Sequence, residues 1–348
     1  MTIRCYAAKK PNEPLEPFQY EPKPLERHEV EVKISHCGIC HSDIHLIDND
    51  WGITDYPLVP GHEIVGTVST LGSDVQGLEK GQRVGIGWQR SACLHCEHCL
   101  RGFENLCSRL KDTCVGNHGG FADAIHIDHR FVFPLPDELE SEYAAPLLCA
   151  GVTVYSPLVY YRVRPAMKVG VIGIGGLGHL ALQFASKMGC EVTAFSSTPE
   201  KESEARGLGA HHFVFDDDSQ TLEKVASTQD FILSTVNADL NWESYVDALR
   251  PGGRLCFVGV PKKAINIPAF SLIVGRNSIS GSPIGSRTDM REMLDFAVRN
   301  DIKPCTEVLP MSKVNEGIDR LRHNQARYRV VLKTPQRGEE PRYTGEQA

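Results

Sequence analysis

Four cysteines lie close together in the sequence at a spacing typical of metal ligands. Cys93, Cys96, Cys99 and Cys107 form the pattern C-x2-C-x2-C-x7-C. Four thiolates at such short intervals can close on one tetrahedral Zn²⁺, which then has no open position for substrate and would stabilise a loop. Iron–sulfur clusters also take four cysteines, so the ligand type alone leaves that alternative open, together with four reduced surface thiols.

A second group of potential metal ligands is spread along the chain. Cys40, His62 and Cys149 would supply two sulfurs and an imidazole, and Glu63 would add a carboxylate. Two thiolates and one imidazole leave the fourth position of a tetrahedral zinc free, as a catalytic zinc requires. Each residue alone also has an ordinary explanation, because buried cysteines and hydrogen-bonded histidines are common in protein cores.

A glycine-rich segment in the second half of the chain has the pattern of a dinucleotide-binding loop. Residues 168–178 begin with a short apolar run that predicts a buried strand, and G-x-G-x-x-G spacing follows. Apolar residues at helical intervals come next, so a helix N-terminus would face a bound diphosphate. The same string also occurs as a plain turn in α/β proteins. The predicted cofactor-binding residues of this loop are Gly173, Gly175, Gly176, Leu177 and Gly178.

The segments after the glycines alternate between predicted strands and helices. Strands are expected at 191–196, 212–215, 230–234 and 254–259, and a helix at 199–208. Such alternation predicts a parallel sheet that is covered by helices on both faces. This part of the chain is therefore expected to form a Rossmann-type, doubly wound domain.

The end of the second predicted strand indicates which dinucleotide is bound. An NAD-binding domain usually carries Asp or Glu about 20 residues beyond the glycines, where it binds the ribose 2′-hydroxyl. Here Ser196, Ser197 and Thr198 stand at that place, and Lys201 follows. Hydroxyls and a lysine fit a 2′-phosphate, which predicts NADP(H). The alternative is a helix cap with a solvated lysine, and the adjacent Glu200 counts against the phosphate.

The first half of the chain has the pattern of a mainly β domain. Prolines between residues 11 and 24 prevent a helix. Residues 30–34 alternate apolar and charged side chains, as a half-buried strand does, and this strand runs into residues 36–45. Further strands are expected at 64–69 and 83–87.

The composition is that of an ordinary soluble protein. The 348 residues carry 23% charged and 41% hydrophobic side chains and a net charge of −7. No basic run suggests a nucleic-acid partner. The first residues lack the apolar core of a signal peptide, and no uninterrupted apolar run approaches membrane-spanning length. We therefore expect a cytoplasmic protein with no membrane partner, whose twelve cysteines are reduced or bind metal.

Together these motifs resemble those of the zinc-dependent medium-chain alcohol dehydrogenases. The resemblance rests on Cys-His-Ser-Asp at 40–43, Gly-His-Glu at 61–63, the four-cysteine cluster and the glycine loop, and covers about residues 3–333. The segments 144–151 and 155–158 are similar to the cinnamyl alcohol dehydrogenase branch, which includes bacterial NADPH-dependent aldehyde reductases.

The resemblance implies a fold and an assembly. It implies a GroES-like, mainly β catalytic domain at 1–147 and 284–348 that holds two zinc ions, and a Rossmann NADP-binding domain at 148–283. Substrate would enter between the two domains. The family also implies a homodimer that is joined through edge strands of the cofactor domains, near Ile279.

The resemblance also implies residue roles. Cys40, His62 and Cys149 would hold the catalytic zinc, with Glu63 as a fourth ligand in some resting states. The remaining implied roles are a proton relay through Ser42 and His45, support of the His62 ring by Asp43, and contact of His41 with the cofactor diphosphate. In isolation, the two histidines His41 and His45 also fit solvated loop positions.

These roles predict hydride transfer between NADP(H) and a small-molecule primary alcohol or aldehyde, with broad aliphatic or aromatic, cinnamyl-type substrates. The main alternative is an NAD-dependent zinc dehydrogenase of polyols or other alcohols. Two further alternatives are a nucleic-acid-binding zinc ribbon, which the acidic net charge opposes, and an inactive scaffold.

Overall fold

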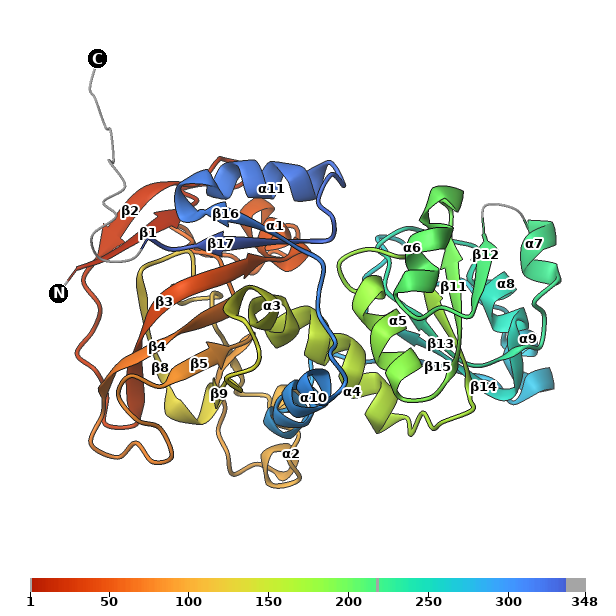
Figure 1. Ribbon diagram of the computed structural model, residues 1–348, viewed down its shortest axis with the longest axis horizontal. Coiled ribbons are helices and arrows are strands. Elements are labelled where there is room, and N and C mark those ends of the chain that lie inside the picture. Colours follow the sequence, from red (N-terminus) through yellow and green to blue (C-terminus); the bar gives the residue numbers. More distant parts are fainter. Residues whose placement is uncertain (1, 217–218, 336–348) are drawn as a thin grey trace, which may run out of the picture. The chain divides into compact units, whose positions relative to one another are not determined.

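The structure is a computed structural model that describes residues 2–216 and 219–335. It divides into two compact units, one of residues 1–149 and 305–348 and the other of residues 150–304 (Figure 1). The sequence-based domain ranges differ from this division at residues 148–149, which were expected in the cofactor domain, and at residues 284–304, which were expected in the catalytic domain. The polar tail from residue 336 onward lies outside the described residues.

Strand β3 (Glu29–Ile39) is the centre of a mixed sheet in the first unit. Among the described residues the strand order is β16-β17-β3-β4-β5-β9, and β8 pairs with the first half of β3 on the edge that β17 shares. The other strands are β4 (Glu63–Leu71), β5 (Arg83–Ile86), β8 (Ala124–Asp128), β9 (Val132–Pro134), β16 (Thr306–Pro310) and β17 (Arg329–Lys333).

Shorter elements surround this sheet. They are β1 (Ile3–Ala7) with β2 (Glu16–Tyr20), β6 (Gln89–Ser91) with β7 (Lys111–Asp112), and the helices α1 (His41–Asp48), α2 (Glu97–Leu100), α3 (Ser141–Pro146) and α11 (Val314–Arg322). Single 3-10 turns lie at Glu104–Leu106, His129–Phe131 and Met311–Lys313.

The β3 strand follows the predicted pattern with one exception. Val30 and Val32 are fully buried, as the alternation predicts, but Glu31 between them is only 8% exposed. Its carboxylate accepts a hydrogen bond from Ser69 and lies 3.2 Å from the ring of His126. A buried carboxylate is tolerated here because both oxygens have partners.

The C-terminal strand returns to the first unit, where β17 pairs with both β16 and β3. In β17, Val331 lies opposite Gly38 of β3 in antiparallel register. This pairing brings Arg329, from near the end of the chain, beside the end of β3, where the Cys-His-Ser-Asp segment at 40–43 begins.

Residues 41–48 form helix α1, which the sequence patterns did not predict. Cys40 is the N-cap, and the carboxylate of Asp43 accepts a 2.9 Å hydrogen bond from the Cys40 amide in a capping box. An acid at this third helical position satisfies a donor that helix geometry leaves free. His41 and His45 therefore lie on a helix.

One continuous helical run, Ser141–Tyr160, is long and apolar enough to span a membrane by length and composition alone. It consists of α3, a π-helical turn at Leu147–Gly151 and α4 (Val152–Tyr160). Because 78% of its apolar 18-residue window is buried within the protein, its apolar character is that of a core helix.

The second unit is built on a parallel sheet, as predicted. Its order is β12-β11-β10-β13-β14-β15 among the described residues, which is 3-2-1-4-5-6 in chain order, the Rossmann arrangement. The strands are β10 (Lys168–Ile172), β11 (Glu191–Ser196), β12 (His212–Phe215), β13 (Gln229–Ser234), β14 (Leu249–Phe257) and β15 (Ser278–Gly281).

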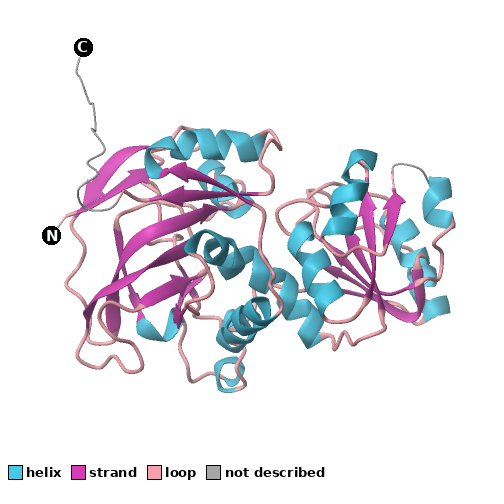
Figure 2. Ribbon diagram, viewed as in Figure 1, coloured by secondary structure: helices cyan, strands magenta, loops and turns pink. Residues whose placement is uncertain are grey.

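Helices cover both faces of this sheet (Figure 2). The helices are α5 (Gly178–Lys187), α6 (Glu202–Gly207), α7 (Ser219–Glu223), α8 (Trp242–Asp247), α9 (Ala269–Gly275) and α10 (Arg287–Arg299), with a 3-10 turn at Pro199–Lys201. The predicted helix at 199–208 is thus a 3-10 turn that continues into α6.

Helix α10 explains why residues 284–304 belong to the second unit. It packs against α4, and the carboxylate of Asp289 accepts a 3.0 Å hydrogen bond from Ser156. Ser286 caps the helix in a capping box with Asp289. Its buried residues Met290, Met293, Leu294 and Ala297 recur at helical spacing, but such local periodicity does not select the core that this face joins.

Candidate metal centres and cofactor site

The four predicted cysteine ligands of the first cluster converge on one point. The sulfurs of Cys93 and Cys99 are 3.9 Å apart, and so are those of Cys96 and Cys107. A tetrahedral zinc with Zn–S bonds of about 2.3 Å requires sulfur–sulfur distances of about 3.8 Å. The set of four thiols therefore fits such an ion without His95 or His98.

Backbone amides support these sulfurs. The amide of Cys96 donates to the sulfur of Cys93, and the amide of Arg109 donates to that of Cys107, each at 3.3 Å. The amides of His95 and Cys96 lower the pKa of Cys93 to about 5. Such donors favour the thiolate, which is the form that binds metal.

The second predicted cluster also comes together, although its members are far apart in the sequence. The ligand atoms of Cys40, His62, Glu63 and Cys149 all lie within 4.8 Å of one another. The two sulfurs are 4.0 Å apart, and His62 Nε2 is 3.3 Å from Cys149. Two thiols and an imidazole at these distances fit a zinc with one position for another ligand.

Three element ends position these ligands. Cys40 caps α1 at the end of β3, and His62 immediately precedes β4, which begins at Glu63. Cys149 lies in the π-helical turn between α3 and α4. Such single π-turns are rare and are frequent at functional sites, because the extra residue redirects a side chain.

Asp43 fixes the ring of His62. Both side chains are fully buried, and Asp43 Oδ1 is 3.0 Å from His62 Nδ1. The same carboxylate accepts hydrogen bonds from the amides of Cys40 and Gly61, so its position is over-determined. A proton on Nδ1 leaves the lone pair of Nε2 directed toward Cys149, as a metal ligand requires.

Glu63 has a partner that the sequence reasoning missed. Arg329 from β17 forms a buried ion pair with its Oε1, while Oε2 has no hydrogen-bond partner among the described residues. Burial raises the pKa of Glu63 to about 7, although Arg329 acts in the opposite direction. A charged residue that begins the apolar run Arg-Val-Val-Leu was the available signal, because a buried arginine needs an acidic partner.

The predicted relay residues both lie on α1. The hydroxyl of Ser42 is 3.7 Å from the sulfur of Cys40. His45 is half-buried, and its Nδ1 is 2.7 Å from the carboxylate of Asp50, a partner that the sequence reasoning also missed. No direct hydrogen bond joins Ser42 to His45 within the described ranges. His41 is exposed on the first turn of the helix.

The glycine loop joins β10 to α5 in the second unit. Gly173 has φ +85°, a conformation that favours glycine. A Cβ on Gly178 would overlap the carbonyl of Gly173, whereas a Cβ on Gly175 would meet nothing within 4 Å. A side chain would therefore not fit at the two ends of the loop, whereas there is space around Gly175 in its middle. Gly176 and Leu177 form the turn before α5.

The predicted 2′-phosphate residues lie at the end of β11. Lys201 reaches back to the glycine loop, where its ammonium donates a 2.7 Å hydrogen bond to the carbonyl of Ile174. Ser196 is buried and its hydroxyl accepts from the amide of Thr198, whereas Ser197 is exposed. The structure therefore brings Lys201 beside the predicted diphosphate loop.

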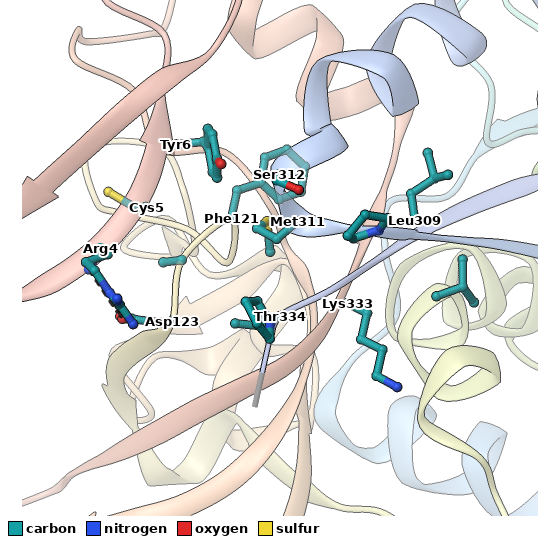
Figure 3. A pocket seen from close by; sticks show the side chains of 14 residues that line it. Arg4, Cys5, Tyr6, Phe121, Asp123, Leu309, Met311, Ser312, Lys333 and Thr334 are labelled. Carbon is teal, nitrogen blue, oxygen red and sulfur yellow. Dashed lines mark hydrogen bonds and ion pairs between the residues drawn. The ribbon is translucent and has the colours of Figure 1, made fainter. Parts of the chain in front are cut away.

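A separate cavity of about 450 Å³ lies in the first unit and contains none of the predicted site residues (Figure 3). Side chains of β1, β16 and β17 line it, and at its edge Arg4 and Asp123 form an ion pair of 3.1 Å. Neither a candidate metal ligand nor the glycine loop faces it, so we do not assign it to the reaction.

The comparisons with known proteins agree with this geometry. The family model "Alcohol dehydrogenase GroES-like domain" matches residues 26–137, and "Zinc-binding dehydrogenase" matches residues 176–299. The chain is 47% identical over 333 residues to the aldehyde reductase AdhA of Synechocystis, covering 95% of this chain and 98% of that protein. The chain belongs to the zinc-binding medium-chain alcohol dehydrogenase family.

Other members of this alcohol dehydrogenase family show the same relation. Cinnamyl alcohol dehydrogenase 2 of Arabidopsis thaliana is 41% identical, over 94% of this chain and 90% of that one. Among solved structures, the cinnamyl alcohol dehydrogenase SbCAD4 of Sorghum bicolor superposes with a TM-score of 0.92 at 38% identity, covering 96% and 98% of the two chains. The enzyme of Helicobacter pylori complexed with NADP(H) gives 0.89 at 31%, with 96% and 98% coverage.

Family membership decides between several of the functions and metal sites that the sequence analysis left open. The chain is an oxidoreductase of alcohols and aldehydes, and zinc is the metal of its family. The iron–sulfur and nucleic-acid-binding alternatives have no support among these matches.

Proposed function

We propose that this dehydrogenase reduces aldehydes with NADPH, including aromatic, cinnamyl-type aldehydes, and that Cys40, His62 and Cys149 hold its catalytic zinc. The observation that carries the proposal is the convergence of two thiols and one imidazole, with Asp43 supporting the imidazole. The similarity to an aldehyde reductase and to cinnamyl alcohol dehydrogenases supports the substrate class.

The roles of the chain's own residues follow from their positions. A bound zinc would supply a Lewis acid that polarises the substrate carbonyl. Ser42, next to Cys40 on α1, would donate the proton that the product oxygen needs, and His45 would replace it from solvent. Asp50 would hold the ring of His45 for this transfer. Arg329 would draw Glu63 away from the metal position that substrate takes.

The cofactor choice rests on the end of β11. Among the described residues no acid side chain ends this strand, and Lys201 lies against the carbonyl of Ile174, where its charge can face a 2′-phosphate. A relative that is named an NADP-dependent alcohol dehydrogenase, from Mycolicibacterium smegmatis, is 39% identical. We propose that Ser196, Ser197, Thr198 and Lys201 select NADP(H) over NAD(H).

We further propose a cytoplasmic homodimer. Strand β15 is at the edge of the parallel sheet among the described residues, and α9, the helix that precedes it in the chain and packs on β14, exposes several large apolar side chains. Phe270 is 74% exposed, Ile273 70% and Val274 69%. Exposed apolar groups of this size next to an open strand edge favour an interface with a second copy.

The test is NADPH oxidation with cinnamaldehyde and with butanal, in protein whose zinc content has been measured. We expect two zinc ions per chain, reduction of both aldehydes, and much slower turnover with NADH. Equal rates with NADH would contradict the cofactor assignment. Activity with polyols and NAD⁺ but not with aldehydes would favour the alternative polyol dehydrogenase.

A further inference from the structure

Residues 92–110 form a lobe that contains the four clustered cysteines. The two segments that flank this lobe in the chain lie against His62 of the Cys40–His62–Cys149 group. The lobe connects β6 to β7, and these strands pair with Gln89 opposite Asp112. The loop is thereby closed at its base. The residues that leave this base on either side are Trp88 and Thr113.

Hydrogen bonds of Thr113 hold the two segments together at the base of the lobe. Its hydroxyl donates to the carbonyl of Gly87 at 2.6 Å and lies 3.0 Å from the carbonyl of Trp88. Its amide donates to the carbonyl of Trp88 at 2.8 Å. Thr113 is fully buried, so water does not compete for these bonds.

Both flanking segments touch His62. The indole ring of Trp88 packs edge-on against the imidazole, with ring centroids 4.8 Å apart and planes at 80°. The Asp112 carboxylate interacts with the Trp88 side chain. On the other side, the sulfur of the fully buried Cys114 lies within 4.8 Å of the His62 ring nitrogen and interacts with it.

Asp43, His62 and Cys114 have the residue types of a metal site, but both oxygens of the Asp43 carboxylate already have hydrogen-bond partners. Asp43 accepts from the amides of Cys40 and Gly61 and faces His62 Nδ1. Asp43 therefore supports the His62 ring on the side opposite Nε2, and Cys114 adds a second contact with the same ring.

We propose that metal in the four-cysteine lobe holds Trp88 and Cys114 against His62, and so raises the affinity of the Cys40–His62–Cys149 site for its own metal. The inference goes beyond the proposed reaction but rests on the two ligand sets named there. Trp88, Thr113 and Cys114 are positioning residues, because they act through His62. Loss of such supporting contacts typically weakens metal binding by about 10–100-fold.

The first experiment removes the lobe metal. Zinc is withdrawn from the purified enzyme with increasing chelator concentrations, and released zinc is counted with a chromogenic indicator. The double variant Cys40→Ser/Cys149→Ser serves as a reference: the phase of zinc release that it lacks is the one that comes from the second site, that of Cys40, His62 and Cys149. In Cys99→Ser/Cys107→Ser we expect one zinc per chain, released at a chelator concentration about 10–100-fold lower than in the unmodified protein.

The second experiment leaves all ligands intact. Thr113→Val removes the hydroxyl that locks the base, and Thr228→Val is the matched control, since its hydroxyl also donates to a carbonyl at 2.6 Å, that of Val225 in the second unit. We expect Thr113→Val to retain two zinc ions but to release that of the second site more easily, and Thr228→Val to behave as the unmodified protein.

Two outcomes would overturn the inference. One is an unchanged second-site release phase when the lobe zinc is absent or when Thr113 is replaced. The other is an equal shift in Thr228→Val, which would indicate a general loss of stability. If Cys99→Ser/Cys107→Ser does not fold, zinc release from Thr113→Val is sufficient to test the inference. The readout is metal binding, so absence of aldehyde reduction would contradict the proposed function without changing this result.

Discussion

At the scale of single residues, the reactive side chains depend on neighbours that hold them in one orientation. Asp43 orients His62, Asp50 orients His45, and Arg329 pairs with Glu63. In each case an acid meets a base, which fixes where a proton or a charge resides. The chemistry is therefore a property of pairs rather than of isolated residues.

Replacing Ser42 by Ala tests the proposed proton donor. We expect kcat for aldehyde reduction to fall by about 100-fold or more, since positioned acid–base groups contribute about 10²–10⁴. Zinc content should not change, because Ser42 lies beside Cys40 without being one of the clustered ligands. Ser73→Ala, at an exposed turn, is the control. Full activity of Ser42→Ala would exclude the relay.

At the scale of elements, strand ends and turns place the functional groups. The π-helical turn presents Cys149, the N-cap of α1 presents Cys40, and the β10–α5 loop forms the glycine-rich turn. These are the positions where regular backbone hydrogen bonding ends, so the chain can approach a metal or a ligand there.

Replacing Gly175 by Ala tests the proposed diphosphate loop. A methyl group there meets nothing within 4 Å, so thermal stability should not change. It would occupy the space a diphosphate needs, and we expect the KM for NADPH to rise about tenfold, equivalent to about 1.4 kcal/mol. Gly178→Ala is the contrasting variant, because its Cβ overlaps Gly173 and should reduce stability. An unaltered KM in Gly175→Ala would argue against the assignment.

His36 in β3 predicts a pH dependence of stability. Burial, together with the charges of Lys333 and Arg83, lowers the pKa of His36 from 6.5 to about 4. Between these values the unfolded chain binds a proton that the folded chain does not, so the free energy of unfolding decreases as the pH falls from 6.5 toward 4.

The check is urea unfolding of the protein and of His36→Gln at several pH values in this range. We expect the variant to lose less stability on acidification, since its side chain does not titrate. The exposed His323→Gln serves as the control. Parallel curves for the protein and His36→Gln would show that His36 is not the group responsible.

At the scale of the whole molecule, the two units divide the chemistry. The first contains both metal-ligand clusters, and the second contains the glycine loop and Lys201. Their family matches follow the same division. The exposed apolar side chains of α9 belong to the second unit. Among the described residues, the members of both metal-ligand clusters all lie in the first unit.

The double variant Phe270→Ser/Ile273→Ser tests the proposed dimer. Both side chains are more than two-thirds exposed, so their loss should not disturb the fold of the unit. We expect sedimentation analysis to show a dimer for the unmodified protein and a monomer or a weakened dimer for the variant. Leu100→Ser, an equally exposed leucine of the cysteine lobe, is the control. A monomeric unmodified protein would contradict the proposal.

The sequence by itself determined the features that depend on neighbouring residues. The cysteine spacing, the glycine loop and the strand–helix alternation after it are local patterns, because short chain segments must close on a metal or turn around a ligand. The four sulfurs converge as the spacing predicts, and the parallel sheet forms in the order that such units adopt.

Only the tertiary structure decided the pairings between distant segments. Arg329 meets Glu63 across 266 residues, α10 packs on α4, and the base of the cysteine lobe lies against His62. Local periodicity shows that a side chain must be buried but not against what, because long-range packing selects among many partners of similar chemistry. Helix α1 was missed for a related reason, since its cap depends on Asp43 and its burial depends on the sheet.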